Sequence, residues 1–400
     1  MHYSEETLKK KILSDKYNKV IFSSGNNYDI YIVGGYVRDI LLHRESLDRD
    51  YVVKGTFMSL LNRVAFETSG KIVRLGRKGL HRVIVQNNVT LDFLPLKYNI
   101  ECDLAQRDFT INALAWSPER GIIDIEGGRK DLSKKLIKMT ALENLKADPV
   151  RILRAYRFAE ELSFSIDPET RNAIRTLGGM IKQTKSERIT LEFFKILNST
   201  EPSGTLKTLL KDSVLERLIS LNYNELEDRL KVISKINKIC EELPLRYRSM
   251  LQERFSQNLI LKGLLRLEVL LEDIPEHIFS LSSQITKRLM LMQKAKALMC
   301  KRNITKRLLF DLFALTENAA IDFLLKRNIL KYIEDYERYL KIKKRGLLSC
   351  WQIMRIVDIY DGPVLGRLLK IVKKAEFDDK VKTKEEAIDL LKKCQKSHVG

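Results

Sequence analysis

A glycine pair separates a β-prone run from a helical run near the start of this chain. Tyr31-Ile32-Val33 is apolar and favours a strand, whereas residues 37–42 have the character of a helix start. Between them, Gly34 and Gly35 allow a tight turn and let a bulky ligand approach the backbone closely. Free backbone N–H groups and the positive end of the helix dipole suit a phosphate at such a turn. The stretch therefore predicts an α/β region with a phosphate-binding turn.

Two acidic residues, Asp48 and Asp50, follow this turn closely in the sequence. They precede the apolar run Tyr51-Val52-Val53, so on a strand both carboxylates face the same way. Two aligned carboxylates beside a triphosphate are what a pair of Mg²⁺ ions needs. A lone glycine pair is usually only a turn, and a lone Asp-x-Asp is usually surface acid. Their order and close spacing together predict nucleotidyl transfer.

The net charge of +20 indicates a polyanionic partner, with nucleic acid ahead of a membrane surface. The 400 residues, 44% of them hydrophobic, can bury a large core and imply two or more domains. No apolar run has the length of a membrane span, and the first residues lack the pattern of a signal peptide. Five scattered cysteines show no zinc-ligand spacing. We expect a cytoplasmic protein with reduced thiols, no disulfide framework and no membrane partner.

Periodicity and turn signals divide the chain into an α/β part of about 145 residues and a helical remainder. The elements expected in the first part, beyond those above, are a helical lead over 5–18, a helix over 56–68, strands over 82–85 and 89–93 joined by a turn at Asn87-Asn88, and a strand over 121–125. From Ala147 onward, amphipathic helices with short connections are expected. Positive charge gathers at 341–345 and 373–396. Such runs fit either a solvated helix face or contacts to an RNA backbone.

A second polar block, residues 106–113, alternates polar and apolar side chains. Arg107 can contact a phosphate, and Asp108, Thr110 and Asn112 add short polar groups. The intervening residues, from Phe109 onward, can anchor the segment in a core. By itself the pattern fits a binding segment, an amphipathic edge strand or a capped helix start equally well.

A third block, residues 147–158, has the pattern of a helix start. Pro149 suits the first helical position, with Asp148 as N-cap. Asp148 and Arg151 are three residues apart, so they can lie together and offer an acceptor and planar donors to a nucleobase edge. Arg151, Arg154 and Arg157 together form a basic stripe. A capped helix with an internal ion pair is the commoner explanation, but the position after the first two blocks favours base recognition.

The ordered motifs resemble those of the class II tRNA nucleotidyltransferases, the family of bacterial-type CCA-adding enzymes and poly(A) polymerases in the polymerase β superfamily. The matching segments are Gly34-Gly35-x-Val37-Arg38-Asp39, Asp48-x-Asp50, residues 107–113, residues 127–132, and Asp148-Pro149-x-Arg151 through Phe158. They span residues 31 to 160, and the helical remainder fits the family by length and character only.

The resemblance implies an α+β fold with a seahorse-like shape. A mixed-sheet nucleotidyltransferase head would be followed by an all-α neck, body and tail. The expected domains are a catalytic head (1–145), a base-reading neck (146–205), a body (206–310) and a tRNA-binding tail (311–400). The implied partners are the acceptor arm and 3′ end of tRNA, with CTP and, in full CCA addition, ATP.

The resemblance also assigns roles to single residues. Asp48 and Asp50 would be catalytic and bind two Mg²⁺ ions, and Asp92 is a weaker candidate for a third acidic ligand. The residues expected to hold the triphosphate and ribose are Gly34, Gly35, Arg38, Arg107, Asp108 and Asn112. The residues expected to recognise the base are Asp148, Arg151, Arg154 and Arg157.

Three departures from the family pattern bear on function. Gln106 stands where a first arginine is usual, which loosens the grip on the triphosphate, and Ala147 stands where a glutamate is usual, which leaves Arg151 less rigid. The segment 93–106 is shorter than in full CCA-adding and A-adding enzymes, whose longer loop helps the pocket switch from CTP to ATP. A short segment is the mark of enzymes that add two cytidines and leave the adenosine to a separate A-adding enzyme.

We therefore expect CC addition, with full CCA addition as the alternative and an A-adding enzyme or poly(A) polymerase further behind. A different class also fits the charge and the fold, namely an inactive nucleotidyltransferase-like RNA-binding protein. Such a protein would not be expected to keep the acidic pair and the nucleotide-binding residues together.

Overall fold

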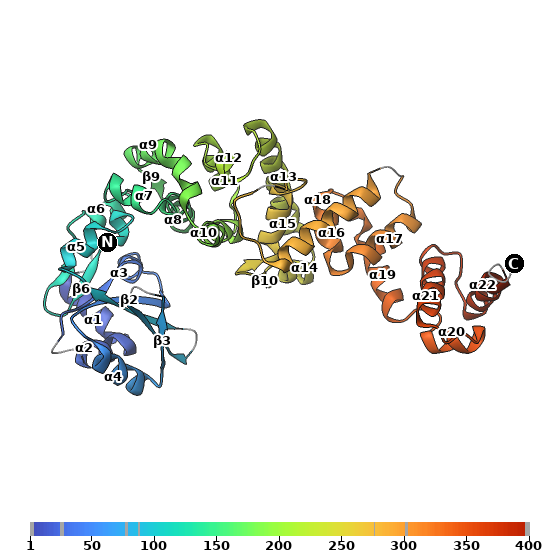
Figure 1. Ribbon diagram of the computed structural model, residues 1–400, viewed down its shortest axis with the longest axis horizontal. Helices are drawn as coiled ribbons and strands as arrows, with labels where there is room; N and C mark the ends of the chain where they lie inside the picture. Colours follow the sequence, from blue (N-terminus) through green and yellow to red (C-terminus); the bar gives the residue numbers. More distant parts are fainter. Residues whose placement is uncertain are drawn as a thin grey trace. The chain divides into compact units, whose positions relative to one another are not determined.

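Two units make up the fold, Met1–Leu218 and Ile219–Gly400, and each has its own buried core. Figure 1 traces the chain from the first unit to the second. The computed structural model describes residues 4–24, 28–76, 79–86, 89–275, 277–300 and 303–396, with the backbone alone at 395 and 396. The predicted turn at Asn87-Asn88 lies outside the described residues.

A seven-stranded mixed sheet organises the first unit. Its strands lie in the order β3–β4–β5–β2–β1–β6–β7, and neighbours are antiparallel except for the parallel pair β2 and β5. The strands are β1 (Ile30–Val33), β2 (Asp48–Lys54), β3 (Lys71–Leu75), β4 (Leu80–Ile84), β5 (Thr90–Leu96), β6 (Ala115–Ser117) and β7 (Gly121–Ile123).

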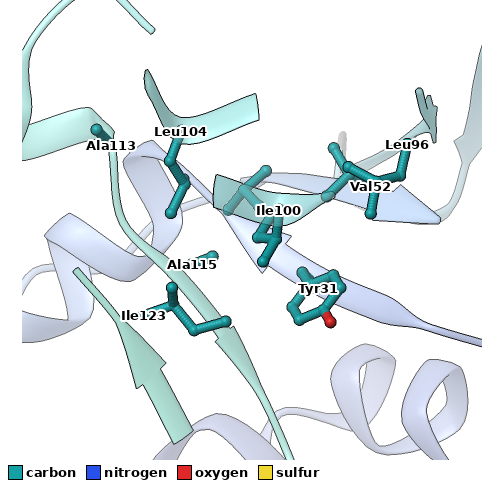
Figure 2. Packing of buried hydrophobic residues seen from close by; sticks show 9 residues of the cluster. Tyr31, Val52, Leu96, Ile100, Leu104, Ala113, Ala115 and Ile123 are labelled. Atoms are coloured by element: carbon teal, nitrogen blue, oxygen red, sulfur yellow. The ribbon is translucent and has the colours of Figure 1, made fainter. Parts of the chain in front are cut away.

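Apolar side chains pack on both faces of this sheet. The helices beside it are α1 (Glu5–Ser14), α2 (Lys16–Ser24), α3 (Gly35–Leu41), α4 (Met58–Thr68) and α5 (Ile100–Ala105). On one face Phe22 of α2 packs edge-on against Tyr51 of β2. On the other, Ile100 and Leu104 of α5 point toward Val52 and its neighbours on the sheet, as Figure 2 shows. Because side chains alternate along a strand, the even-numbered residues of β2 share the α5 face.

Helices dominate the rest of the first unit. They are α6 (Gly128–Ser133), α7 (Leu142–Ala147), α8 (Arg151–Leu162), α9 (Pro168–Leu177), α10 (Ser186–Asn198), α11 (Ser203–Lys211) and α12 (Leu215–Leu218). A short parallel pair, β8 (Leu136–Ile137) and β9 (Ser165–Ile166), joins the segments before and after α8. The packing of α8 against α10 and α11 brings residues distant in sequence together.

The second unit is almost entirely helical. Its helices are α13 (Tyr223–Glu242), α14 (Leu245–Leu251), α15 (Leu261–Leu270), α16 (Ser283–Met299), α17 (Lys306–Thr316), α18 (Ala320–Lys326), α19 (Ile333–Lys344), α20 (Cys350–Val357), α21 (Gly362–Phe377) and α22 (Lys384–Lys396). A small hairpin pairs β10 (Arg254–Ser256) with β11 (Leu259–Ile260). None of the helices in the described residues combines the length and the apolar character needed to cross a bilayer.

The expected α+β fold with an N-terminal mixed sheet is confirmed, and three details are wrong. The helical lead is two helices that break at Asp15, whose carboxylate accepts backbone N–H bonds at the start of α2. The helical remainder is not purely α, because β9 and the β10–β11 hairpin lie within it. The strand expected over 121–125 ends at Ile123. The proposed domain boundaries stay a prediction.

Candidate active site

Three carboxylates share one face of the sheet. Asp48 and Asp50 lie two residues apart on β2, and the register of the parallel pair sets Asp92 of β5 directly beside Asp50. Asp48 is exposed and accepts a hydrogen bond from Thr90 Oγ1 at 3.0 Å. Both oxygens of Asp92 accept from Arg82 on β4, at 2.7 Å each. The prediction that Asp48 and Asp50 face the same way is confirmed, whereas the oxygens of Asp92 are already bonded.

Burial and two neighbouring carboxylates disfavour the charged form of Asp50. Burial raises the pKa of Asp50 to about 6, and the charges of Asp92 and Asp48 add to that effect against the opposing charge of Arg107. Arg107 and Arg82 offset part of this negative charge, and the raised pKa of Asp50 shows that a bound cation would stabilise its ionised form.

The donor set fits a hard divalent cation completed by a substrate. Mg²⁺ commonly binds through one or two carboxylates plus substrate phosphates, which matches the oxygen ligands of Asp48 and Asp50. In the described residues, no group of three or more acidic, histidine or cysteine side chains is arranged to hold a metal by itself. Asp92 as a third ligand therefore stays a prediction, and its bidentate pair with Arg82 explains why it is not free.

The glycine turn is shaped by an arginine that lies over it. Gly34 has a positive φ of 74°, and its N–H donates to the carbonyl of Leu114. A Cβ at Gly34 would meet Arg107 Nη1 at 2.7 Å, so only glycine admits that guanidinium. Asp103 holds Arg107 through Nε and Nη2, at 3.0 and 2.8 Å. Arg107 Nη1 lies over the turn and donates to the carbonyl of Asn112 at 3.5 Å, and its contact with a phosphate stays a prediction.

Arg38 and Asn112, both expected at the triphosphate and ribose, are joined in a buried chain of hydrogen bonds. Arg38 donates to Asn112 Oδ1 at 2.8 Å and to Asp39. Asn112 donates from Nδ2 to Asp108, whose other oxygen accepts from Arg154 Nε at 2.7 Å. Of the alternatives left open for this block, the edge strand and the capped α-helix start are not found, because Thr110–Asn112 forms a 3-10 turn that is buried.

Asp108 holds this chain together as an ionised group. Burial alone would raise its pKa, but the Arg154 charge and the hydrogen bond from Asn112 bring the pKa below its ordinary value. Its oxygens face Arg154, Asn112 and the N–H of Phe109. Asp108 therefore positions the residues around it, and direct contact with a nucleotide stays a prediction.

The basic stripe of α8 is largely paired with carboxylates. Arg157 donates to Glu192 of α10 at 2.6 Å and to Glu161 at 2.7 Å, and its side chain is 9% exposed. Arg154 lies 3.8 Å from Glu192 and pairs with Asp108. Their geometry is that of supports for the neck, and their roles in base recognition stay predictions.

Asp148 and Arg151 come together, but the helix start differs from the expected one. α8 begins at Arg151, and the Asp148 side chain does not cap it. The carboxylate instead forms a bidentate pair with Arg188 of α10, at 2.8 Å for both bonds. Arg151 lies 3.9 Å away, and its Nη1 is buried without a hydrogen-bond partner in the described residues. The two side chains lie together as predicted, and their role in base recognition stays a prediction.

Arg188, Glu192 and Arg82 take part in the site although the sequence did not single them out. Arg188, Glu192 and Lys195 recur at helical spacing on α10, a signal that the three charges share one face of the helix, with Glu192 buried and the two cations exposed. Arg82 carried no comparable signal, because its partner Asp92 is fixed only by strand register.

A mixed sheet with a glycine turn and an aligned acidic pair, followed by a helical neck, defines a nucleotidyltransferase-type protein. The poly A polymerase head domain matches residues 30–138, and the domain described as the "probable RNA and SrmB- binding site of polymerase A" matches residues 163–221. The chain therefore carries a head domain and an RNA-binding domain of the poly A polymerase type within its first 221 residues.

Two relatives and a solved structure are similar to this chain over different shares of its length. A CC-adding tRNA nucleotidyltransferase of Synechocystis is 38% identical over 47% of this chain, and the chain spans 46% of that protein. A CC-adding tRNA nucleotidyltransferase of Geobacter sulfurreducens is 29% identical over 92% of both chains. The fold is shared with a Thermotoga maritima CCA-adding enzyme complexed with tRNA, at a TM-score of 0.78, 22% identity and 98% coverage of both chains.

Proposed function

We propose that this protein is a template-independent nucleotidyltransferase that adds two cytidines from CTP to the 3′ end of tRNA and releases pyrophosphate. The observation that carries the proposal is the unbroken connection between the two halves of the site. From Arg38 beside the glycine turn, hydrogen bonds run through Asn112 and Asp108 to Arg154 in the neck. Phosphate-binding and base-reading residues are thereby fixed relative to each other within one unit.

Each group then has a chemical task. Arg107 Nη1 and the N–H groups of the turn bind phosphate oxygens. When bound, divalent ions at Asp48 and Asp50 supply the charge that activates a hydroxyl nucleophile and neutralises the leaving pyrophosphate.

Base selection follows from the donors and acceptors of the neck. Cytosine presents an exocyclic amine, which Asp148 can accept, and ring acceptors, which the unpaired Nη1 of Arg151 can bond. Uracil presents a carbonyl where cytosine has the amine, so the Asp148 carboxylate repels it. Adenine also presents an amine, so these two residues alone do not explain restriction to CTP.

The short connection between β5 and α5 favours CC addition over full CCA addition. β5 ends at Leu96, α5 begins at Ile100, and Asn99 caps α5 by accepting from the N–H of Cys102 at 2.8 Å. Three residues therefore bridge the two elements, with the last committed to a cap. This leaves no long loop at the position where the family's full CCA-adding members carry one, which supports a pocket fixed on CTP.

The test is extension of a tRNA that lacks its CCA end, with CTP alone, ATP alone and both, followed by sequencing of the products. Two cytidines and no adenosine with both nucleotides present are expected. A complete CCA end would establish the alternative, full CCA addition. Asp48→Ala should lower incorporation by about 10³-fold while tRNA binding survives, with exposed Asp29→Ala as the matched control. Full activity of Asp48→Ala would contradict the catalytic assignment.

A further inference from the structure

A buried cation lies directly behind the acidic pair. Arg49 separates Asp48 from Asp50 in β2, and because side chains alternate along a strand it extends from the opposite face of the sheet. That face is the one on which α2 packs. Arg49 is 7% exposed. A guanidinium so far from water needs a charged or polar partner, and whatever holds it also bears on the strand of the acidic pair.

The partner is Asp15, at the break between α1 and α2. One oxygen of its carboxylate accepts from Arg49 Nη2 at 2.6 Å, and the other accepts from the N–H groups of Tyr17 and Asn18, at 3.0 Å each. Arg49 Nη1 donates to the carbonyl of Leu47 at 3.1 Å. In the described part of the chain, Asp15 is the only carboxylate within ion-pair distance of this arginine. Asp15 therefore ties the start of α2 to β2.

Aromatic rings enclose the same guanidinium. It lies 5.4 Å from the ring centre of Tyr17 in α2 and 5.2 Å from that of Tyr36 in α3. A cation over an aromatic ring is attracted by the electrons of the ring face, and more strongly when water is excluded. Tyr36 immediately follows the glycine pair. Arg49 and the two rings therefore join the helical lead, the strand of the acidic pair and the glycine turn in one place.

A fully buried amide makes a second connection between the same segments. Asn18 of α2 is completely shielded from solvent. Its Oδ1 accepts from the hydroxyl of Tyr51, and its Nδ2 donates to the hydroxyl of Tyr36 at 2.7 Å and to the carbonyl of Ile12 at 3.0 Å. Tyr51 follows Asp50, so the amide bonds to one residue next to the acidic pair and to one next to the glycine pair. A satisfied polar network of this kind specifies one arrangement of its parts.

We propose that Asp15 is a positioning residue for nucleotidyl transfer: through Arg49 it fixes strand β2, and with it the spacing of the acidic pair from the glycine turn. None of the motifs that carry the family resemblance lies in the helical lead. A misplacement of reacting groups by about 1 Å can lower a rate by about 100-fold, so support from behind the sheet matters for the chemistry in front. The proposal rests on the proposed function, since it takes Asp48 and Asp50 as the groups that bind the metal ions.

Removing the charge of Asp15 tests the kinetic consequence. Asp15→Asn keeps an oxygen for the two N–H groups at the start of α2, because asparagine caps helices as well as aspartate does, but it leaves Arg49 without its counter-ion. The kcat for CTP incorporation should fall about tenfold, with KM for CTP changed less than about twofold. The melting temperature should also fall, because a buried charge loses its partner. A raised KM with an unchanged kcat would overturn the proposal.

A second substitution separates stability from position, because a buried ion pair commonly serves stability alone. Arg49→Met in the Asp15→Asn background removes the unpaired charge, and an apolar side chain of similar length should restore the melting temperature. The kcat should stay low, because the bond between the start of α2 and β2 is still missing. Recovery of kcat together with the melting temperature would show that the pair only stabilises the fold, and would overturn the proposal.

Binding of Mn²⁺ gives a readout that needs no turnover. With CTP present and tRNA absent, the dissociation constant for Mn²⁺, followed by electron paramagnetic resonance, should rise about tenfold in Asp15→Asn. The matched control is Asp212→Asn in the same unit. Asp212 is also a buried acid bonded to arginines, and its hydrogen-bond partners in the described residues lie on α8 and α9.

The control should lower the melting temperature and change Mn²⁺ affinity less than about twofold, because it does not bear on β2. Mn²⁺ affinity of Asp15→Asn equal to that of the wild-type protein would overturn the proposal. Equal losses of Mn²⁺ affinity in Asp15→Asn and Asp212→Asn would also overturn it, because they would follow from lower stability alone.

Failure of this proposal and failure of the proposed function are distinguishable. If the wild-type protein incorporates CTP into tRNA and Asp15→Asn matches it in kcat and Mn²⁺ affinity, the positioning role falls and the function stands. If the wild-type protein incorporates no nucleotide but its Mn²⁺ affinity depends on Asp15, the function falls and the positioning of the acidic pair stands.

Discussion

Two buried clusters of acidic residues, one in each unit, differ in how their charge is balanced. In the first unit, Asp108 and Glu192 face arginines, and the pKa of each lies below its ordinary value because those charges outweigh burial. In the second unit, Glu268 and Asp322 both bond to the single guanidinium of Arg288, and burial raises the pKa of each. One oxygen of each lacks a hydrogen-bond partner in the described residues.

This difference indicates what the buried charges do in each unit. Where the charges of arginines outweigh the effect of burial, the carboxylates stay ionised and fix neighbouring side chains at defined positions. Where burial outweighs the charges of Arg288 and Lys326, the pKa of Glu268 rises to about 8 and this acid keeps its proton at neutral pH. The first arrangement suits a site that must hold its geometry, and the second makes the stability of a helical core depend on pH.

The largest effect is expected from the glycine turn. Gly34→Ala should lower CTP incorporation by about 100-fold, because the added Cβ meets Arg107 Nη1 and pushes it off the turn. Gly55→Ala is the matched control, since Gly55 also has a positive φ, of 84°, but has no atom within 4 Å of an added Cβ. Steady-state rates and melting temperatures of both variants test this prediction. Equal activity losses would show that backbone strain alone, and not Arg107, matters.

A buried acid that faces two arginines should matter for stability. Asp212 is fully buried and accepts from Tyr156, Arg171 and Arg175. Asp212→Asn should cost about 2 kcal/mol of unfolding free energy, because the half-exposed arginines retain water while the buried bonds weaken. Chemical denaturation followed by hydrogen exchange in α8 and α9 measures it. The control Asp228→Asn changes an exposed acid of the second unit, and a loss as large there would contradict the reasoning.

A smaller effect is expected where Arg188 holds Asp148, the carboxylate that we propose reads the base. Arg188→Ala should raise KM for CTP about tenfold with a smaller change in kcat, because Asp148 loses its bidentate partner. Arg188 is half-exposed, so the melting temperature should hardly change. Lys185→Ala, an exposed cation three residues earlier, is the control. A fall in kcat with an unchanged KM would argue against a role in holding Asp148.

The smallest effect is expected in the second unit and concerns pH. Burial and the neighbouring Asp322 raise the pKa of Glu268 to about 8 from an ordinary 4.5. The folded state therefore binds more protons than the unfolded state between about pH 5 and pH 8, so stability falls as pH rises through this interval. Glu268→Gln should flatten that decline by about 1 kcal/mol, measured by hydrogen exchange in α15 and α18. An unchanged slope would mean that Glu268 is ionised throughout.

Much of the head was predictable because its signals are local. The run before Gly34, the glycine pair and the alternation around Asp50 each specify their own element, and the structure has β1, α3 and β2 where they were expected. The anchoring residues Phe109 and Ile111 are buried as their pattern indicated. Periods of two and 3.6 residues are properties of short stretches, so they survive without tertiary information.

What the sequence could not provide depends on distant contacts. The pair of Asp148 with Arg188 joins residues 40 apart and replaces the predicted helix cap. The placement of Asp92 beside Asp50 follows from parallel pairing of β2 with β5. The β8–β9 pair consists of two-residue strands, too short for any periodicity to show. Each of these features is fixed by packing and not by local pattern.

The bond between Asp108 and Arg154 also constrains how the protein is made. Asp108 is buried in the head, but the cation that keeps it ionised is added 46 residues later in synthesis. A nascent chain that ended at residue 145 would have to bury this carboxylate without its partner, at a cost of several kcal/mol. We expect the sheet-bearing part of the first unit to complete its core only after α8, which carries Arg154, has left the ribosome.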